Sequence, residues 1–245
     1  MSVRIPSKSL KGLRRIAAYW QARSELDRLA AMHRGRVMNK WKHYFEIYDR
    51  HFARYRDTDL TLVEIGVAGG GSLDLWRNYL GPKARLFGID INPDCKRFES
   101  PGTRIIIGDQ GSPEFLESLA RETGPIDILI DDGSHAYDHQ LATFRTLFGH
   151  IREDGVYACE DLHTSYDTAE FGGGVRKTGT FVEFLKDLID ELNAWFWRDG
   201  VDTEPHAFAR SAHGIHFYPT LAVIEKRAMT RPLLTPAGHT PAANS

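Results

Sequence analysis

Five short runs of apolar and β-branched residues, separated by helical segments, occupy the middle of the chain. The runs lie at 60–66, 84–90, 103–109, 126–132 and 155–161, and helical patterns fill 72–80, 113–122 and 137–150. Each run ends in an acidic residue or a glycine. Strands that are apolar on both faces and alternate with helices form parallel sheets that are covered on both sides. The pattern therefore predicts an α/β fold with a Rossmann-like, doubly wound and mostly parallel sheet.

The flanking segments complete the predicted organisation. Residues 1–56 hold 14 Lys and Arg against 4 Asp and Glu, whereas the remainder holds 17 against 29. Apolar residues at helical spacing in this basic segment predict two amphipathic helices that pack on the body or on a second subunit, so we expect a homodimer or higher homo-oligomer. Residues 57–229 are predicted to form the main domain, with a helix at 180–197 and an antiparallel edge strand pair at 213–227. The tail, 230–245, is expected to be mobile.

Composition excludes several classes of protein. No apolar run approaches the roughly 18 residues of a membrane span, and the first 20 residues lack the apolar core of a signal peptide. Cys95 and Cys159 are too few for a disulfide framework or a Cys-rich zinc site, and they suit a reducing compartment. We therefore expect a cytoplasmic protein with no membrane span. The basic residues of the first segment are read as a solvated helix face, so no nucleic-acid partner is predicted.

The segment VEIGVAGGGS follows the first run and indicates a cofactor loop. Its glycines allow close approach of a ligand to the backbone and present amide donors at a helix N-terminus. Gly66, Ala68 and Gly71 fit a dinucleotide fingerprint imperfectly, so an NAD-linked oxidoreductase is one reading. Glu64, Gly66, Ala68 and Gly70 fit the S-adenosylmethionine pattern (D/E)-x-G-x-G-x-G, with alanine in the middle position.

Acidic residues at the strand ends favour S-adenosylmethionine over NAD. Its sulfonium and ammonium are cationic, whereas an acidic rim repels a pyrophosphate. Asp90 is expected to hold the ribose hydroxyls, and Asp131 is read either as a cofactor contact or as the cap of the next helix. The predicted cofactor-binding residues are Glu64, Gly66, Ala68, Gly70, Ser72, Asp90, Asp109, Gln110 and Asp131.

The segments LIDDGSHAYDHQ and CEDLHTSY predict a metal site. Asp132, Glu160 and Asp161 follow neighbouring strands, so their carboxylates are expected to converge. An oxygen-only ligand set favours Mg²⁺, with Mn²⁺ or Ca²⁺ as alternatives. His135 lies on the turn after Asp132 and is the candidate catalytic base. The other histidines are read as structural, with His163 as a weaker candidate for the site.

These blocks resemble one known family. Together with GIDI and IIIGDQ, they are similar to the metal-dependent sugar O-methyltransferases of macrolide biosynthesis, the mycinamicin and tylosin type, over about residues 36–227. The resemblance implies the class I methyltransferase fold, S-adenosylmethionine and Mg²⁺ as cofactors, and a sugar hydroxyl as acceptor. It also implies that His135 is the general base and that Lys40, His43 and Tyr44 line the site. With no large domain preceding the matched blocks, a sugar hydroxyl is better supported than a macrolactone.

Other readings remain open at this point. A cephalosporin hydroxylase-like group shares similar blocks, and a non-catalytic protein that binds an adenosine ligand is a third possibility beside the NAD-linked enzyme. The glycine-rich segment 170–179, with Phe171 and Phe181 nearby, is read either as a substrate lid or as a surface loop. Acceptors within the family reading include a glycoside, an oligosaccharide or polysaccharide precursor, and a glycosylated natural product.

Overall fold

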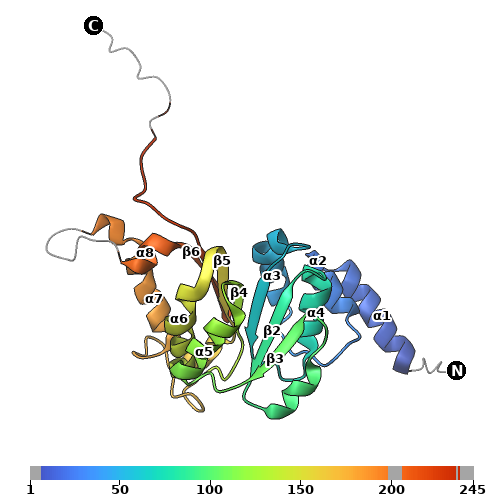
Figure 1. Cartoon of the computed structure of the whole chain (residues 1–245). Helices are drawn as coiled ribbons and strands as arrows, with labels where there is room; N and C mark the ends of the chain where they lie inside the picture. Colours follow the sequence, from blue (N-terminus) through green and yellow to red (C-terminus); the bar gives the residue numbers. More distant parts are fainter. Residues whose placement is uncertain (1–6, 198–205, 236, 238–245) are drawn as a thin grey trace, which may run out of the picture.

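The computed structural model describes residues 7–197, 206–235 and 237 and contains one seven-stranded sheet (Figure 1). Its strand order is β3-β2-β1-β4-β5-β7-β6. The first five strands pair in parallel, whereas β7 pairs antiparallel with β5 and β6. The bounds are β1 Thr61–Ile65, β2 Arg85–Asp90, β3 Thr103–Ile107, β4 Ile126–Asp131, β5 Ile151–Cys159, β6 Ala212–Tyr218 and β7 Leu221–Lys226. The predicted α/β sheet with an antiparallel edge is confirmed.

Helices cover both faces of the sheet, and alternate residues of each strand divide between them. In β1, Leu62 belongs to a core cluster with α2, α3 and α4, whereas Val63 belongs to one with α5, α6 and α7. Because neighbouring residues of a strand point to opposite faces, both faces of this strand are apolar. The helices are α1 Ser7–Trp20, α2 Glu25–Met32, α3 Tyr44–Phe52, α4 Gly71–Leu80, α5 Pro113–Thr123, α6 Tyr137–Leu147, α7 Phe181–Leu192 and α8 Ala207–Ser211.

Local chemistry explains where these helices begin and end. The hydroxyl of Ser112 accepts a hydrogen bond from the backbone N–H of Phe115, and Pro113 occupies the first turn of α5, where its missing N–H costs nothing. Thr180 caps α7 in the same way. Gly81 ends α4 with φ of 89°, a conformation that a side chain disfavours. All three helices begin within one residue of their predicted starts, and α4 and α5 also end within one residue of their predicted ends, whereas α7 ends at Leu192 rather than at residue 197.

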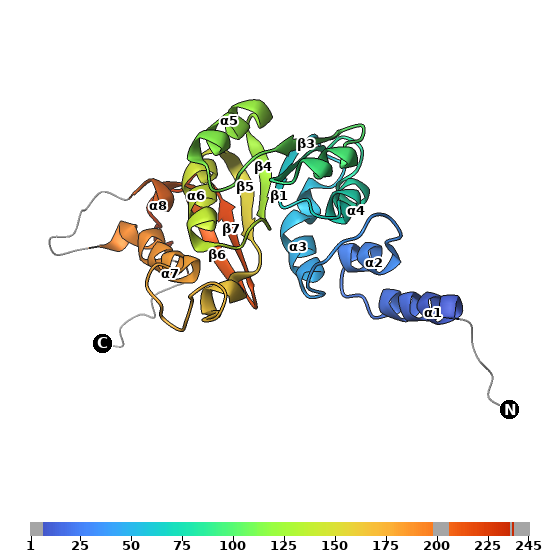
Figure 2. The same cartoon turned by 90° about the horizontal axis from the view of Figure 1, so that it is seen from below.

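The N-terminal segment was predicted to form two helices that pack on the body or on a second subunit, and it forms three helices with different environments. Helix α3 packs into the core with α4 and β1. Helix α1 instead projects from the body beside α2 (Figure 2). Its apolar residues Leu13, Ile16 and Trp20 are exposed, Trp20 to 80% of its surface. Helix α1 therefore carries an apolar stripe that the described residues of this chain do not cover.

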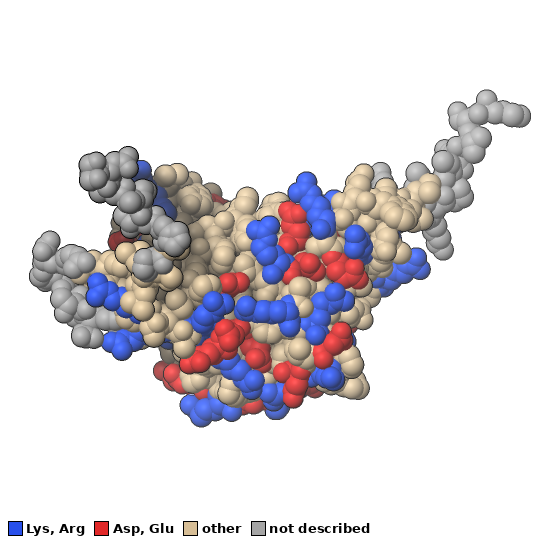
Figure 3. Space-filling model, turned by 90° about the horizontal axis from the view of Figure 1, so that it is seen from above, with Lys and Arg blue, Asp and Glu red and all other residues tan. Residues whose placement is uncertain are grey.

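The sequence charge asymmetry does not produce one continuous basic surface on the face seen in Figure 3. Lys and Arg lie interspersed with Asp and Glu over that face. No helix in the described part of the chain is long and apolar enough to cross a membrane. The predicted mobile tail at 230–245 falls largely outside the described residues, which near this end of the chain reach only 235 and 237.

Candidate functional site

A cavity of about 410 Å³ opens at the carboxyl ends of β1, β2, β3 and β4. Ligands of doubly wound sheets bind at this edge, beside the point where the strand order reverses. Here that point lies between β1 and β4, which are neighbours in the sheet but not in the sequence. The cavity is lined by Asn39, Ile65, Gly66, Ala68, Ile89, Asp90, Ile91, Gly108, Asp109, Gln110, Asp132, Gly133, Ser134, His135, His139 and Asp161.

The glycine-rich turn after β1 forms one wall and is anchored by Asp90. One oxygen of the Asp90 carboxylate accepts hydrogen bonds from the backbone N–H groups of Val67 and Ala68, at 3.0 and 2.9 Å. Burial opposes ionisation of Asp90, but these bonds and one from Asn92 together lower its pKa. Gly66 has φ of 97°, and a Cβ there would lie 1.9 Å from the carbonyl oxygen of Asp132. The turn therefore requires glycine where it crosses the next site segment.

The structure divides the nine predicted cofactor residues into two groups. Those that line the cavity are Gly66, Ala68, Asp90, Asp109 and Gln110. Those outside the lining are Glu64, Gly70, Ser72 and Asp131. Glu64 is fully buried and accepts hydrogen bonds from the Ser72 hydroxyl and the Trp76 indole N–H, so it anchors α4 to β1 from behind the turn.

Asp131 does not cap the helix that follows it, so that reading of its role is wrong. The cap position of α6 is Ala136, which makes no side-chain capping hydrogen bond. Asp131 is 1% exposed and accepts hydrogen bonds from Gln110 Nε2, at 2.6 Å, and from the Tyr157 hydroxyl, at 3.3 Å. Burial raises the pKa of Asp131 to about 7. Its partners place it below the cavity floor, where it holds Gln110 in position.

A buried lysine sits among three carboxylates beside the cavity. The ammonium of Lys40 lies 2.5 Å from Glu160 Oε1, 2.8 Å from Asp132 Oδ2 and 3.2 Å from Glu64 Oε1, and its side chain is 1% exposed. The hydroxyl of Tyr48 also donates to Glu160 Oε1, at 2.5 Å. Burial raises the pKa values of Glu64 and Glu160, with Lys40 as the main opposing influence. Three carboxylates outnumber the single ammonium. The cluster can therefore accept a further cation to balance its negative charge.

The predicted metal ligands do not meet as a single set. Ligand atoms of Asp132, His135 and Asp161 lie within 4.8 Å of one another, and those of Glu64, Asp132 and Glu160 form a second such group. Asp132 is common to both. Glu160 points toward Lys40 and Tyr48, because these residues of the N-terminal segment supply its buried hydrogen bonds. The donors around Asp132 are mainly carboxylate oxygens, a chemistry that fits Mg²⁺ better than zinc.

Asp161 is held in place from the N-terminal segment. The indole N–H of Trp41 donates to Asp161 Oδ1 at 2.8 Å, and the hydroxyl of Tyr44 lies 3.3 Å from the same oxygen. His163 Nδ1 lies 3.6 Å from that oxygen. The other oxygen, Oδ2, faces His135. Tyr44 therefore lies at the site as the family resemblance implies, whereas His43 is turned away to the carbonyl of Pro219.

His135 combines an unusual backbone with an incompletely bonded side chain. Its φ is 60°, and its Nδ1 is buried without a hydrogen-bond partner in the described structure. Its Nε2 lies 3.5 Å from Asp161 Oδ2. Ala68 and Asp161 also have positive φ, and all three residues line the cavity. Three of the seven non-glycine residues with positive φ in the described structure therefore line this cavity, and strained backbone clusters at functional sites.

Sequence reasoning missed several residues of the site and misplaced one. His139, read as structural, lines the cavity and bonds the Ser134 hydroxyl through Nδ1 at 2.8 Å. Trp41 and Tyr48 gave no signal, because they reach Asp161 and Glu160 across 120 and 112 residues of sequence. Phe181, read as part of a lid, is the first residue of α7 and is buried in the core.

The segment 170–179 is tied to the protein near its start. The Tyr137 hydroxyl donates to the carbonyl of Phe171 at 2.5 Å, and the backbone N–H of Gly174 donates to the carbonyl of Ser165 at 3.0 Å. None of its residues lines the cavity described above. Its movement as a lid stays a prediction.

Comparisons with known proteins agree with this geometry. Residues 63–162 match a family model described as a methyltransferase domain. The chain is 39% identical over 212 residues to the 8-demethyl-8-(2-methoxy-alpha-L-rhamnosyl)-tetracenomycin-C 3'-O-methyltransferase of Streptomyces olivaceus, covering 82% of this chain and 54% of that protein. It is 38% identical over 189 residues to the mycinamicin VI 2''-O-methyltransferase of Micromonospora griseorubida, covering 73% of this chain and 47% of that one.

A solved structure extends the comparison to the fold. The MycE methyltransferase of the mycinamycin biosynthetic pathway, in complex with Mg, SAH and mycinamycin VI, superposes with a TM-score of 0.74 at 34% identity. The match covers 84% of this chain and 54% of that chain. The sheet is therefore that of the class I methyltransferase fold. The chain spans about half the length of the relatives it matches.

Proposed function

The chain is a homologue of the sugar O-methyltransferases that modify glycosylated natural products, and from this premise we propose that it transfers a methyl group from S-adenosylmethionine to a sugar hydroxyl. The main observation in support of this proposal is that Asp132, His135 and Asp161 converge on a cavity that is also lined by the glycine-rich turn held by Asp90. An NAD-linked oxidoreductase is not supported by these relatives.

Each cofactor has residues suited to it. Gly66, Ala68 and Asp90, with Asp109 and Gln110, would hold S-adenosylmethionine along the carboxyl ends of β1 to β3. Asp132, Glu160 and Asp161 would hold Mg²⁺ once the Lys40 ammonium releases Asp132 and Glu160, because Asp132 now belongs to a separate group with each of the other two carboxylates. When bound, S-adenosylmethionine supplies an electrophilic methyl group, and Mg²⁺ orients the acceptor oxygen and stabilises its developing negative charge.

The chain's own residues complete the reaction. His135 Nε2 takes the proton from the acceptor hydroxyl as the new carbon–oxygen bond forms and the methyl–sulfur bond breaks, with S-adenosylhomocysteine as the leaving product. A base is needed because a free alcohol is a poor nucleophile at neutral pH. Asp161 Oδ2, 3.5 Å away, stabilises the imidazolium that results. Trp41 and Tyr44 fix the other oxygen of Asp161 and so orient the carboxylate toward His135. The backbone of the glycine-rich turn would hold the methyl donor in the same cavity.

The acceptor is proposed from the relatives. Their names place the methyl group on the 2', 3' or 2'' hydroxyl of sugars attached to tetracenomycin or mycinamicin. The shared feature is a sugar linked to a larger molecule, so we propose a glycoside as substrate class. On the face seen in Figure 3, Lys and Arg are interspersed with Asp and Glu, which does not favour the binding of a nucleic acid to that face.

A screen by mass spectrometry tests this function. The protein is incubated with S-adenosylmethionine, Mg²⁺ and a panel of rhamnosyl and other deoxysugar glycosides. We expect one methyl increment on a sugar fragment, its loss with a chelator and its recovery with added Mg²⁺. Turnover that is insensitive to the chelator, or calorimetric binding of NADH in preference to S-adenosylhomocysteine, would overturn the proposal.

Self-association and a cytoplasmic location belong to the same proposal. The exposed apolar residues of α1, among them Leu13, Ile16 and Trp20, support a homo-oligomer in which α1 is covered. Light scattering is expected to give a smaller mass for Trp20→Lys than for the wild type, whereas equal masses would remove α1 from the interface. Cys95 and Cys159 are both buried and unpaired, which supports a reducing compartment.

A further inference from the structure

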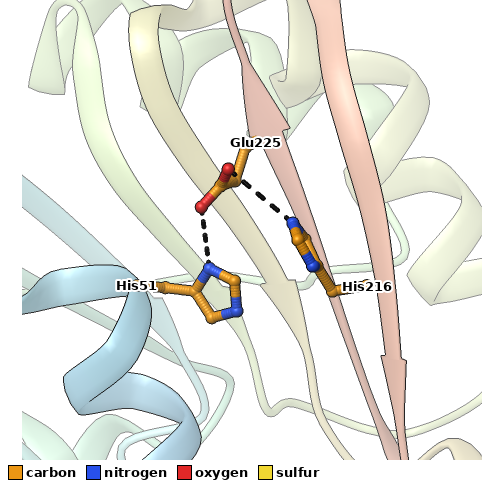
Figure 4. A group of neighbouring side chains, drawn as sticks. All are labelled: His51, His216 and Glu225. Carbon is orange, nitrogen blue, oxygen red and sulfur yellow. Dashed lines mark hydrogen bonds and ion pairs between the residues drawn. The ribbon is translucent and has the colours of Figure 1, made fainter.

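Two histidines and a glutamate meet between the end of α3 and the β6–β7 hairpin, apart from the cavity (Figure 4). Glu225 lies between the two rings in that view. His51 Nδ1 lies 2.8 Å from Glu225 Oε1, and His216 Nε2 lies 3.7 Å from Glu225 Oε2. The ring centroids of the histidines are 4.7 Å apart. One ligand atom from each of the three residues falls within 4.8 Å of the others.

The fold brings these residues together from three elements. His51 is in the last turn of α3, His216 is in β6 and Glu225 is in β7. His216 pairs with Val223, two residues before Glu225, so both side chains leave the same face of the hairpin. That face also carries Tyr218, whose hydroxyl lies 3.0 Å from His51 Nε2. The cluster therefore joins α3 to the edge of the sheet.

From this geometry we propose that His51, His216 and Glu225 bind a divalent transition-metal ion, with zinc as the fitting chemistry. Two imidazole nitrogens and one carboxylate form a ligand set that zinc sites use, with water in the fourth position. The His216 side chain is 40% exposed and that of Glu225 is 19% exposed, which leaves an open path for the ion and its water. This site goes beyond the methyl-transfer function and shares no residue with the proposed magnesium site.

The hydrogen bonds around the cluster leave an imidazole nitrogen of each histidine available to bind a metal ion. His216 Nε2 is buried and has no hydrogen-bond partner in the described structure, although it points toward Glu225. The Tyr218 hydroxyl holds His51 Nε2, so Nε2 can carry the ring proton while the lone pair of Nδ1 faces the ligand position. Burial lowers the pKa of His51, which favours the neutral, ligating imidazole.

A metal at this position would fasten α3 to the β6–β7 hairpin. The same helix carries Tyr44 and Tyr48, which contact Asp161 and Glu160 at the active cavity. The hairpin contacts the other end of α3 through the carbonyl of Thr220, which accepts from the Tyr44 hydroxyl at 2.8 Å. The ion would thus be a structural clamp, and its loss would affect the stability of the protein more directly than the chemistry of methyl transfer.

Cobalt titration of the whole, metal-stripped protein tests the proposal. Excess Mg²⁺ is present throughout to occupy the oxygen-rich site, and Co²⁺ is the probe. The wild type is expected to take up one equivalent of Co²⁺ with the intense visible bands of a low-coordinate nitrogen- and oxygen-ligated ion. It is also expected to gain thermal stability with added ion.

Three variants make the assignment specific. The His216 side chain is partly exposed, so His216→Ala should still fold. We expect it to weaken Co²⁺ binding by about 10–100-fold and Tyr218→Phe to weaken it by about 10-fold. His150→Ala is the control, because His150 faces a single carboxylate, that of Glu117, at 4.0 Å on the surface. Absence of uptake by the wild type, or equal affinity of the wild type and His216→Ala, would overturn the proposal. Neither outcome bears on methyl transfer, which is measured separately with Mg²⁺.

Discussion

Replacing His135 with alanine is expected to lower kcat for methyl transfer by about 10²–10⁴-fold, the usual contribution of a positioned general base. The loss corresponds to about 3–5 kcal/mol of transition-state stabilisation. Binding of S-adenosylhomocysteine should be nearly unchanged, because His135 is proposed to act on the acceptor proton and not on the methyl donor. Single-turnover kinetics with a glycoside acceptor, beside calorimetry with S-adenosylhomocysteine, measure the two effects.

His139 provides a matched control for this variant. It also lines the cavity, but its Nδ1 bonds the Ser134 hydroxyl, and His139 belongs to neither carboxylate group at the site. His139→Ala is therefore expected to retain kcat within about 10-fold. A larger loss in His139→Ala than in His135→Ala would contradict the assignment of the base. The substitution itself should change the backbone strain at position 135 little, because alanine disfavours a positive φ as histidine does.

Replacing Lys40 with methionine is expected to lower the free energy of unfolding by about 3–5 kcal/mol in the absence of divalent ions. The change removes the ammonium from among Glu64, Asp132 and Glu160. The loss of stability is large because buried carboxylates are left without a cation to balance their charge. Urea denaturation measures the loss. Lys42→Met, two residues away at an exposed position, is the control and should change stability by less than about 0.5 kcal/mol.

The Lys40→Met variant should also show a distinctive dependence on pH and metal. Burial already raises the pKa values of Glu64 and Glu160, and removal of Lys40 raises them further. The folded state then holds protons that the unfolded state releases, so stability is greatest at acidic pH and falls as the pH rises above the unfolded pKa. Added Mg²⁺ should restore more stability to this variant than to the wild type. A flat pH profile without a loss of stability would contradict the account of the cluster.

Much of the fold follows from local sequence pattern. The five buried strands and the helices between them were predictable, because apolar runs bounded by Gly or Asp record burial on both faces. The antiparallel hairpin at the edge was predictable from its turn at Pro219 and Thr220. The exposure of α1 was not predictable. The apolar stripe at Leu13, Ile16 and Trp20 indicates that this face packs against another surface, but it does not identify that surface.

The site was predictable where it depends on strand ends and not where it depends on long-range contacts. Asp132, His135 and Asp161 meet because parallel strands end at one edge of the sheet. The direction of Glu160 depends on Lys40 and Tyr48, which come from a segment more than 100 residues earlier. Family resemblance pointed to Lys40, but no periodicity or spacing indicates that its ammonium bridges two carboxylates.

The most direct test of the account is anomalous diffraction from crystals grown with Mn²⁺ and S-adenosylhomocysteine. We expect a manganese peak in contact with carboxylate oxygens of Asp132, Glu160 and Asp161, beside His135 and facing the sulfur across the cavity, with Lys40 moved away from at least one of its present partners. Crystals in which Lys40 still bridges Asp132 and Glu160 and no manganese lies between the three carboxylates would contradict it.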